Sequence, residues 1–382
     1  MYKEFSDPLY GFVRIDLREL SLIDSMVFQR LRYVKQLGLA YLVFPSAHHT
    51  RFEHALGVLH IADSILRGSL RDPDARTRTL VRLAALLHDL GHPPFSHTTE
   101  VLLPQRRTHE DVTRRIVLES EVYETLRRNF DLSHEDVELL LRITLGKPED
   151  EEERLLSELI TGQFGADRMD YLRRDAFFCG VSYGLFDLNR LLSTLQVVFE
   201  EGRRVLAVHR SGLRALENFL ISRHFMYLQV YFHKVVRILS IHLVELIRKI
   251  LPEESFDRLE TFLRMNDCTV LSRALAEPAC REDLERLFGR KHFKEVFSTK
   301  ERELFEELRR ELLLRYPAEV LRFDEARKDP YDEEVFIFDG SGIVRAGEVS
   351  DLIASLKPIE IYRVYVKPEL RGEVCSLLRR LV

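Results

Sequence analysis

The sequence has few cysteines, no tryptophan and no long apolar run. Its 4 cysteines are scattered over 382 residues, and no two of them have the spacing of a metal-binding pair. This usage excludes the disulfide framework of a small secreted protein, so we expect a reduced, cytoplasmic environment. The chain begins with charged residues, and no apolar stretch approaches the roughly twenty residues that a membrane span needs, so we expect neither a signal peptide nor a membrane anchor.

The sequence also lacks a large excess of one charge. It has 57 Lys and Arg residues against 62 Asp and Glu residues, which gives a formal net charge of -5. Because no overall positive field would attract nucleic acid or anionic lipid, we expect neither as a partner, and any phosphate must be bound by local groups. Apolar residues form 45% of the chain and charged residues 31%, a composition typical of a globular protein with a substantial core.

Apolar residues recur at intervals of three and four from about residue 20 to about residue 250. This spacing predicts a helical domain. The start of the chain differs, because a turn at 7–11 followed by an alternating segment at 12–15 indicates a short strand, and a second hairpin is expected around 205–208. We interpret the acidic tract at 149–153 as the solvated start of a helix and give it no chemical role.

The pattern changes toward the C-terminus. Beyond about residue 315, alternating segments at 335–338 and 359–366 and a final amphipathic stretch from 368 indicate a small α+β appendage. Residues 251–315 have a charged, helical pattern and are expected to connect the two parts. We therefore predict a mostly α fold with a helical domain over 1–250, a helical connector over 251–315 and a small α+β domain over 316–382.

The pair His88 and Asp89 stands in an unusual place for a carboxylate. It follows the apolar run 81–87, which indicates a helix inserted into a core, and the C-terminal end of a helix carries negative partial charge that repels Asp89. Burying this carboxylate without a partner would cost several kcal/mol. A divalent metal ion shared by the two side chains would remove the conflict.

Two more residues extend this pair into a candidate ligand set. His54 lies in the segment 50–57 and Asp167 in the segment 164–171. Two imidazoles and two carboxylates suit a catalytic first-row divalent ion better than a closed structural zinc site. Each histidine taken singly is better explained as a packed core residue, and it is the joint order of His, His-Asp and Asp that favours a metal.

Ordered segments carry this pattern through residues 3–237: 28–38, 44–45, 51–54, 88–97, 167–171 and 231–234. Together they resemble the HD-domain phosphohydrolase superfamily, whose members bind one metal with a histidine, a His-Asp doublet and a distal aspartate. Within it, the chain is similar to the branch of deoxynucleoside triphosphate triphosphohydrolases that includes the bacterial dGTPases and the mammalian SAM-and-HD-domain enzyme. The resemblance implies an HD-domain helical bundle with short N-terminal strand elements.

The resemblance also implies which residues hold the metal. The ligands would be His54, His88, Asp89 and Asp167. Asp170, one helical turn after Asp167, would be an outer-sphere or structural residue instead. This ligand set accepts iron, manganese, nickel, cobalt or zinc according to supply, and magnesium could accompany the nucleotide.

Four residues are implied at the reaction itself: His92, His97, His109 and Glu110. In the family, histidines at these positions act as acid catalyst and phosphate contacts. Such groups are needed because the leaving oxygen must gain a proton while the metal activates water. His92 has an alternative explanation as a histidine that caps a helix C-terminus.

A further set of residues matches the family's contacts to substrate. Arginine binds phosphate well because its planar guanidinium donates to two oxygens at once. The implied phosphate contacts are Arg51, Arg168, Arg223 and Lys234. The implied residues around the sugar are Gln36, Leu37, Tyr171 and Asp175, and Tyr231 is a further implied substrate contact. Leu37 is also explained as an ordinary core residue, and a pocket that merely packs a deoxyribose rejects an added hydroxyl by only about a hundredfold, so ribonucleotides remain candidate ligands.

A regulatory nucleotide site is implied as well. Lys3, Asp24, Gln29 and Arg32 resemble positions that bind an activating guanine nucleotide, GTP or dGTP, at an oligomer interface. They are equally explained as a polar, exposed helix face. We therefore expect a homo-oligomer, and three functions stay open: hydrolysis of a deoxynucleoside triphosphate to deoxynucleoside and inorganic triphosphate, hydrolysis of another nucleotide phosphoester, and nucleotide sensing with little turnover.

Overall fold

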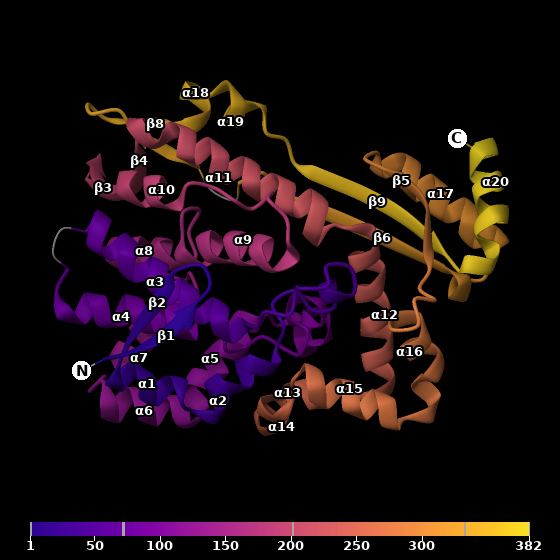
Figure 1. Ribbon diagram of the computed structural model, residues 1–382, viewed down its shortest axis with the longest axis horizontal. Helices are drawn as coiled ribbons and strands as arrows, with labels where there is room; N and C mark the ends of the chain where they lie inside the picture. The colour runs from indigo at the N-terminus through magenta and orange to yellow at the C-terminus, as the bar shows by residue number, and fades with distance from the viewer. Residues whose placement is uncertain (1, 71–72, 201, 332–333, 382) are drawn as a thin grey trace.

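A β-hairpin opens the chain, as the sequence predicted. In the computed structural model, which describes residues 2–70, 73–200, 202–331 and 334–381, strand β1 (Tyr2–Asp7) pairs antiparallel with β2 (Gly11–Asp16). The Asp7 carboxylate accepts hydrogen bonds from the backbone N–H groups of Leu9 and Tyr10, which closes the turn between the strands. The hairpin lies across the helical part of the molecule (Figure 1).

Helices dominate the chain up to residue 250, which confirms the mostly α prediction. Their bounds are α1 (Leu17–Ile23), α2 (Met26–Gln29), α3 (Arg51–Ser69), α4 (Ala75–Leu87), α5 (His109–Glu119), α6 (Glu121–Asn129), α7 (His134–Thr144), α8 (Glu151–Ile160), α9 (Ala166–Cys179), α10 (Leu188–Thr194), α11 (Leu213–Met226) and α12 (Lys234–Ile250). The acidic tract begins α8, where the Asp150 side chain caps the helix N-terminus, as expected.

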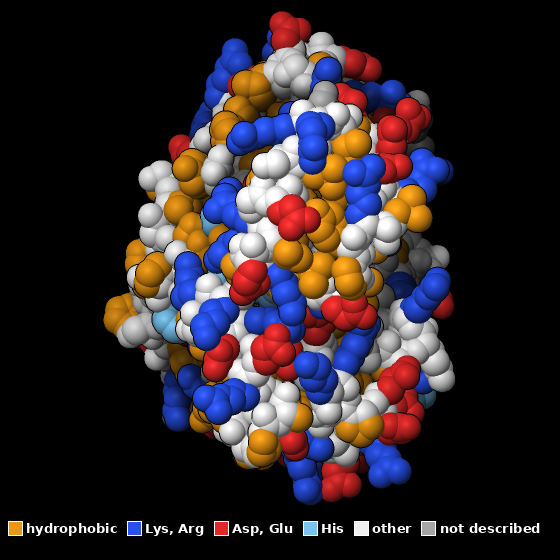
Figure 2. Space-filling model, turned by 90° about the vertical axis from the view of Figure 1, so that its right-hand side faces the viewer, with side chains coloured by type: hydrophobic (Ala, Val, Ile, Leu, Met, Phe, Trp, Pro, Cys, Tyr) orange, Lys and Arg blue, Asp and Glu red, His pale blue; other side chains and the backbone are white. Residues whose placement is uncertain are grey.

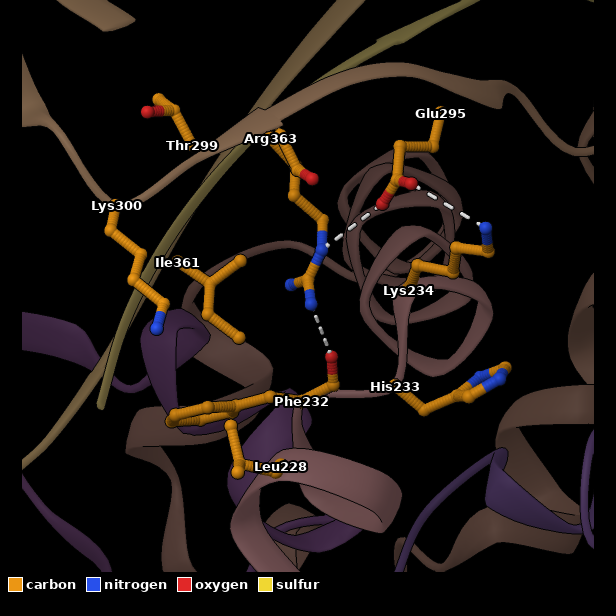
Figure 3. A pocket seen from close by; sticks show the side chains of 10 residues that line it. Leu228, Phe232, His233, Lys234, Glu295, Thr299, Lys300, Ile361 and Arg363 are labelled. Atoms are coloured by element: carbon orange, nitrogen blue, oxygen red, sulfur yellow. Dashed lines mark hydrogen bonds and ion pairs between the residues drawn. The ribbon is translucent and has the colours of Figure 1, made fainter.

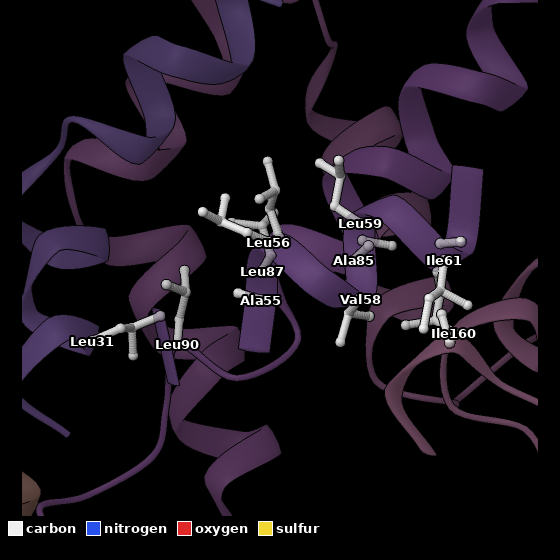
Figure 4. Packing of buried hydrophobic residues seen from close by; sticks show 14 of the residues in the cluster. Leu31, Ala55, Leu56, Val58, Leu59, Ile61, Ala85, Leu87, Leu90 and Ile160 are labelled. Carbon is white, nitrogen blue, oxygen red and sulfur yellow. The ribbon is translucent and has the colours of Figure 1, made fainter. Parts of the chain in front are cut away.

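The core of this part forms around α3 and α4. Buried residues occupy nearly the whole circumference of α3 and of the second half of α4, from Leu80 onward, whereas the first turns of α4 are more exposed. Figure 4 shows α3 residues such as Val58 and Ile61 packed near Ala85 of α4 and Ile160 of α8. The end of α4 is thereby fixed deep in the molecule, where the His-Asp doublet follows it.

The remainder of the chain mixes helices and strands. Its helices are α13 (Glu254–Asp257), α14 (Leu259–Arg264), α15 (Asp267–Ala276), α16 (Arg281–Leu287), α17 (Arg302–Arg315), α18 (Ala346–Val349), α19 (Asp351–Ser355) and α20 (Arg371–Leu381). Its strands are β5 (Lys294–Thr299), β6 (Leu321–Lys328), β7 (Phe336–Phe338), β8 (Ile343–Arg345) and β9 (Ile359–Val366). Strands β5, β9 and β6 form an antiparallel sheet whose apolar residues pack with those of α17 and α20 (Figure 1).

Strand pairing crosses the domain boundaries that the sequence suggested. The predicted second hairpin consists of β3 (Leu195–Glu200) and β4 (Arg203–His209), and β7 from the C-terminal part joins it by parallel pairing with β4. Strand β5 lies within 251–315, a segment expected to be helical. The division at 250 and 315 stays a prediction, and the small C-terminal sheets are present as expected.

The surface carries charges of both signs. On the face that Figure 2 shows, Lys and Arg side chains are interspersed with Asp and Glu side chains. Within the described residues, we find no helix that combines the length and apolar character needed to cross a membrane.

Candidate metal centre and cavity

Four side chains that the sequence singled out meet inside the helical part. His54 comes from α3, Asp167 from the first turn of α9, and His88 and Asp89 directly follow α4. His54 Nε2 lies 3.1 Å from Asp167 Oδ1, 3.3 Å from His88 Nε2 and 3.5 Å from Asp89 Oδ2. His88 Nε2 lies 3.4 Å from Asp89 Oδ1.

This arrangement fits a bound metal ion. One ligand atom each of His54, His88 and Asp167 lies within 4.8 Å of the other two. Donor atoms about 2 Å from one ion are separated by roughly 3 Å, which matches these distances. The histidines are buried and the Asp167 side chain is 28% exposed, so the cluster keeps one side open toward solvent or a substrate. It is a His/Asp metal site with the ligand chemistry of a catalytic ion.

The orientation of His54 is fixed from behind. Its Nδ1 lies 2.8 Å from Asp170 Oδ2, and Asp170 also accepts hydrogen bonds from Arg174 and from the Tyr10 hydroxyl of the N-terminal turn. Burial lowers the pKa of His54, but its bonds to Asp167 and Asp170 outweigh burial and raise that pKa to about 10. The site therefore stabilises a positive charge at His54 Nε2, where an ion would replace the proton. Asp170 has the outer-sphere place that the sequence suggested.

Asp89 has a cationic partner within the chain. Arg51 Nη1 lies 2.5 Å from Asp89 Oδ2, and each of the two side chains is only 4% exposed. Burial raises the pKa of Asp89, but the charges of Arg51 and His88 outweigh it and hold the pKa well below its usual value. The sequence position of Asp89 called for a cation, and Arg51 is one such partner in addition to the metal ion that the sequence argument suggested. Arg51, expected as a phosphate contact, is held beside the metal cluster.

A cluster of three histidines adjoins the metal site. The His92 ring stacks on that of His109 with centroids 3.9 Å apart, and the His97 ring meets His92 edge-on at 4.6 Å. Glu100, which the sequence analysis missed, lies 2.9 Å from His97 Nδ1 and 2.7 Å from His109 Nδ1. Glu110 is farther away, at 3.6 Å from His109 Nδ1.

The two stacked histidines have opposite protonation tendencies. Burial and the charge of Arg51 hold the pKa of His92 well below its ordinary value. Burial also lowers the pKa of His109, but the bond to Glu100 outweighs it and raises that pKa. His109 is therefore the member suited to hold a proton. His88, not His92, occupies the C-cap of α4, so the alternative explanation of His92 as a helix cap is wrong.

A cavity of about 910 Å³ joins these groups. The expected site residues that line it are Gln36, Leu37, Arg51, His88, Asp89, His92, His97, His109, Glu110, Asp167, Arg168, Tyr171, Asp175 and Tyr231. At one end, Asp175 Oδ1 lies 2.7 Å from His49 Nε2, while Asp175 Oδ2 accepts a hydrogen bond from the Tyr231 hydroxyl at 2.7 Å. His49 was also missed by the sequence analysis. Nothing in the sequence around His49, which stands two residues before Arg51, distinguishes it from an ordinary histidine.

Two expected phosphate contacts lie elsewhere. The buried Arg223 donates to the backbone carbonyls of Asp329 and Pro330. Lys234, the first residue of α12, points toward Glu295 of β5 with Nζ 3.4 Å from Oε1, in a separate pocket that Arg363 also lines (Figure 3). A π-helical turn over 227–231 precedes α12 and redirects the chain, so that Tyr231 faces the cavity and Lys234 does not.

The residues expected at a regulatory site lie on or near the surface. Lys3 on β1, Asp24 and Arg32 are exposed, and Gln29 is half-buried. Gln29 Nε2 donates to the Ile23 carbonyl and its Oε1 accepts from Arg32 Nε at 2.7 Å. The Arg32 guanidinium stacks on the ring of Phe52 at 3.5 Å. Within one copy of the chain, the described contacts of these side chains are local.

Comparison with known proteins identifies two conserved-domain matches. Residues 51–175 match the family model described as HD domain, and residues 186–315 match the model described as HD associated region. A crystal structure of a hypothetical protein from Aquifex aeolicus is 60% identical, with a TM-score of 0.91 over 99% of this chain and 100% of that chain.

Curated relatives extend this similarity. The uncharacterized protein MJ1154 of Methanocaldococcus jannaschii is 34% identical over 94% of this chain and 77% of its own length. The uncharacterized protein YwfO of Bacillus subtilis is 40% identical over 65% of this chain. The deoxynucleoside triphosphate triphosphohydrolase SAMHD1 of Gallus gallus is 30% identical over 65% of this chain. The matches cover 55% of YwfO and 45% of SAMHD1, about half of each.

Proposed function

We propose, from the premise that this chain belongs to the HD-domain family of metal-dependent phosphohydrolases, that it cleaves deoxynucleoside triphosphates to deoxynucleoside and inorganic triphosphate. The similarity to a deoxynucleoside triphosphate triphosphohydrolase supports this substrate class. So does the composition of the cavity, which combines metal ligands, cationic side chains and a polar end suited to a sugar. The metal ligands and cationic side chains suit the phosphates of a nucleotide, and the polar end suits its sugar.

The end of the cavity that would hold the sugar gives the strongest support for a nucleotide substrate. Gln36 is buried, and its Oε1 has no hydrogen-bond partner among the described residues. A buried polar atom is normally paired, so this oxygen calls for a donor from a ligand. Asp175 has one partner on each oxygen and keeps further lone pairs that can accept a hydroxyl proton. A sugar hydroxyl would satisfy both groups.

The phosphate end supplies the groups that hydrolysis needs. We propose His54, His88, Asp89 and Asp167 as the metal ligands. A divalent ion in such a site lowers the pKa of water and neutralises phosphate charge. Arg168, whose guanidinium lines the cavity, would bind phosphate oxygens, and Arg51 would add positive charge beside them.

The histidine cluster would manage the proton. Burial lowers the pKa of His109, but the bond to Glu100 outweighs it and raises that pKa, and we propose that His109 donates a proton to the leaving oxygen. His92 remains neutral and supports the His109 ring by stacking. His97 and Glu110, at the more exposed edge of the cluster, would contact phosphate and orient His109 respectively.

The decisive experiment identifies products. Protein reconstituted with each candidate metal is incubated with the four deoxynucleoside triphosphates, with and without GTP, and the products are separated by chromatography. We expect free deoxynucleoside and inorganic triphosphate, no direct orthophosphate, and loss of both products in the His88→Ala/Asp89→Ala double variant. Release of orthophosphate would indicate another phosphoester hydrolase. Binding without metal-dependent turnover would indicate a nucleotide sensor.

We further propose that GTP or dGTP activates the enzyme at an interface between copies, around Lys3, Asp24, Gln29 and Arg32. Within one copy, Gln29 and Arg32 form hydrogen bonds only with nearby groups of the same chain, so the nucleotide would need a second copy to complete its site. Light scattering with and without GTP should show nucleotide-dependent assembly that Arg32→Ala weakens. An assembly state independent of GTP would contradict this part of the proposal.

A further inference from the structure

Asp267 is distant in sequence from the metal ligands but touches two loops of the cavity. It is the first residue of α15, within the segment that matches the HD associated region, and it is 2% exposed. Its Oδ1 accepts the backbone N–H of Phe95 at 2.7 Å, and its Oδ2 accepts that of Lys35 at 3.0 Å. One carboxylate thus binds the backbone of both loops.

Both loops supply residues that line the cavity. The loop after Lys35 carries Gln36 and Leu37, and the loop after Phe95 carries Ser96 and His97, and all four of these residues line the cavity. The loops are also tightly packed against each other. A Cβ on Gly38, which has φ +53°, would lie 3.1 Å from the Phe95 carbonyl oxygen.

The Phe95–Ser96 turn has a costly backbone conformation. Phe95 has φ 64° and Ser96 has φ 56°, so two consecutive residues with side chains lie in the left-handed region. Such conformations persist only where the surroundings hold them. The Asp267 carboxylate provides a charge-assisted bond to the N–H of the first strained residue.

The turn is connected to the metal site by hydrogen bonds. Ser96 Oγ donates to the Lys35 carbonyl at 2.7 Å and accepts from Arg51 Nε at 2.9 Å. The same guanidinium pairs with Asp89. A continuous series of contacts therefore runs from Asp267 through Ser96 and Arg51 to the His-Asp doublet.

Arg30 links the segment around Asp267 to the other end of the loop 92–97, which we call the catalytic loop. Its buried guanidinium donates to the Met265 carbonyl at 2.7 Å and to the His92 carbonyl at 2.8 Å. The segment 265–267 is thus bound to His92 on one side and to Phe95 on the other. The start of α15 is therefore linked, through Arg30 and Asp267, to both ends of the turn between His92 and Ser96.

We propose that Asp267 is a positioning residue that couples the HD associated region to the catalytic loop. By holding the Phe95–Ser96 turn, it places Ser96 against Arg51 and keeps the His97 ring in contact with His92 and His109. The kinetic consequence rests on the proposed hydrolase function, whereas the structural coupling does not. Loss of the carboxylate would loosen both loops and slow turnover without removing the metal ligands.

The test compares Asp267→Asn with a matched control, Asp283→Asn. Asp283 on α16 is also a buried carboxylate of the associated region, but it binds Lys249 and Arg286, neither of which lines the cavity. Hydrogen exchange measured by mass spectrometry on the metal-loaded full chain reports the loops directly. For Asp267→Asn we expect at least about tenfold faster exchange in 34–38 and 94–98, and unchanged metal content. The control should leave both loops protected.

Kinetics provide the second readout. We expect Asp267→Asn to lower kcat at least about tenfold, because the turn that places Ser96 and His97 is loosened, and to raise KM as well, because Gln36 and Leu37 lie on the other loosened loop. Should that variant fail to fold, Ser96→Ala interrupts the same series of contacts downstream and should give the same kcat loss. Unchanged exchange in both loops for Asp267→Asn, equal effects of the control, or an unaffected kcat in Ser96→Ala would overturn the proposal. If the wild-type chain hydrolyses no nucleotide, the exchange measurement still decides the coupling.

Discussion

Gly57 offers the sharpest test of how the metal site is built. It lies in the middle of α3, three residues after His54, where alanine would ordinarily be preferred. A Cβ at this position would lie 2.0 Å from Asp170 Oδ1 and 2.4 Å from Arg174 Nη2. The fully buried pair that orients His54 occupies the space of the missing side chain.

The two effects of Gly57→Ala differ in sign and size. Better helix propensity stabilises the folded chain by about 1 kcal/mol. Displacing or breaking the buried pair of Asp170 and Arg174 costs about 3 to 5 kcal/mol. The second effect is larger, so we expect a net loss of about 2 to 4 kcal/mol, or a fall in Tm of about 2 to 5 °C. Because His54 loses its orienting carboxylate, metal affinity should fall about 10- to 100-fold.

Thermal unfolding and metal titration measure both quantities. Gly68→Ala is the control, since it lies in the same helix, is exposed, and would bring a Cβ no closer than 3.8 Å to the Leu192 carbonyl oxygen. The control should raise Tm slightly and leave metal affinity unchanged. If Gly57→Ala proved as stable as its control and bound metal equally well, the close packing of Asp170 behind His54 would not control the site.

Three further predictions follow from the charged groups of the site. Arg51→Ala leaves Asp89 buried without its cation, so the metal-free variant should lose about 3 to 5 kcal/mol of unfolding free energy and the metal-loaded variant should lose less. Denaturant titration measures both losses, and equal losses in the two forms would contradict a shared role of Arg51 and the ion. Glu100→Gln removes the bond that raises the pKa of His109. Because a proton donor is lost as pH rises through its pKa, the alkaline limb of the kcat profile should move to lower pH, and an unmoved limb would exclude His109 as the donor. Removing the metal with a chelator should lower Tm by an amount that grows with the logarithm of the ratio of metal concentration to Kd, and a Tm that does not respond to added metal would argue against a site at His54 and His88.

The order of chemical motifs made the metal site predictable. His54, the His88–Asp89 doublet and Asp167 follow one another in a pattern with few structural explanations, and the helices that carry them have clear apolar spacing. The His-Asp doublet also follows the apolar run 81–87 at the end of α4, so its burial could be predicted from the sequence. What the sequence could not reveal was the partner of Asp89, because Arg51 lies 38 residues away and their pairing depends on how α3 and α4 pack.

The omissions and the unexpected positions have the same cause. Lys234 stands three residues after Tyr231, yet a change of backbone direction sends the two side chains to different pockets. Glu100 and His49 lack a local signal, since each becomes significant only through a contact with a histidine or carboxylate from another segment. Asp267 is an extreme case, with partners 172 and 232 residues away. Sequence spacing predicts residues on one element well and contacts between elements poorly.

The parallel pairing of β4 with β7 has a consequence for how the chain is made. Val208 lies opposite Ile337, so the hairpin near the middle of the chain waits for a partner that is synthesised more than a hundred residues later. Until that strand leaves the ribosome, one edge of β4 presents unpaired backbone groups, which invite association with other nascent chains. Fragments that end at residue 315 would retain this exposed edge permanently, and expression of such truncations should yield aggregates even though every metal ligand is present.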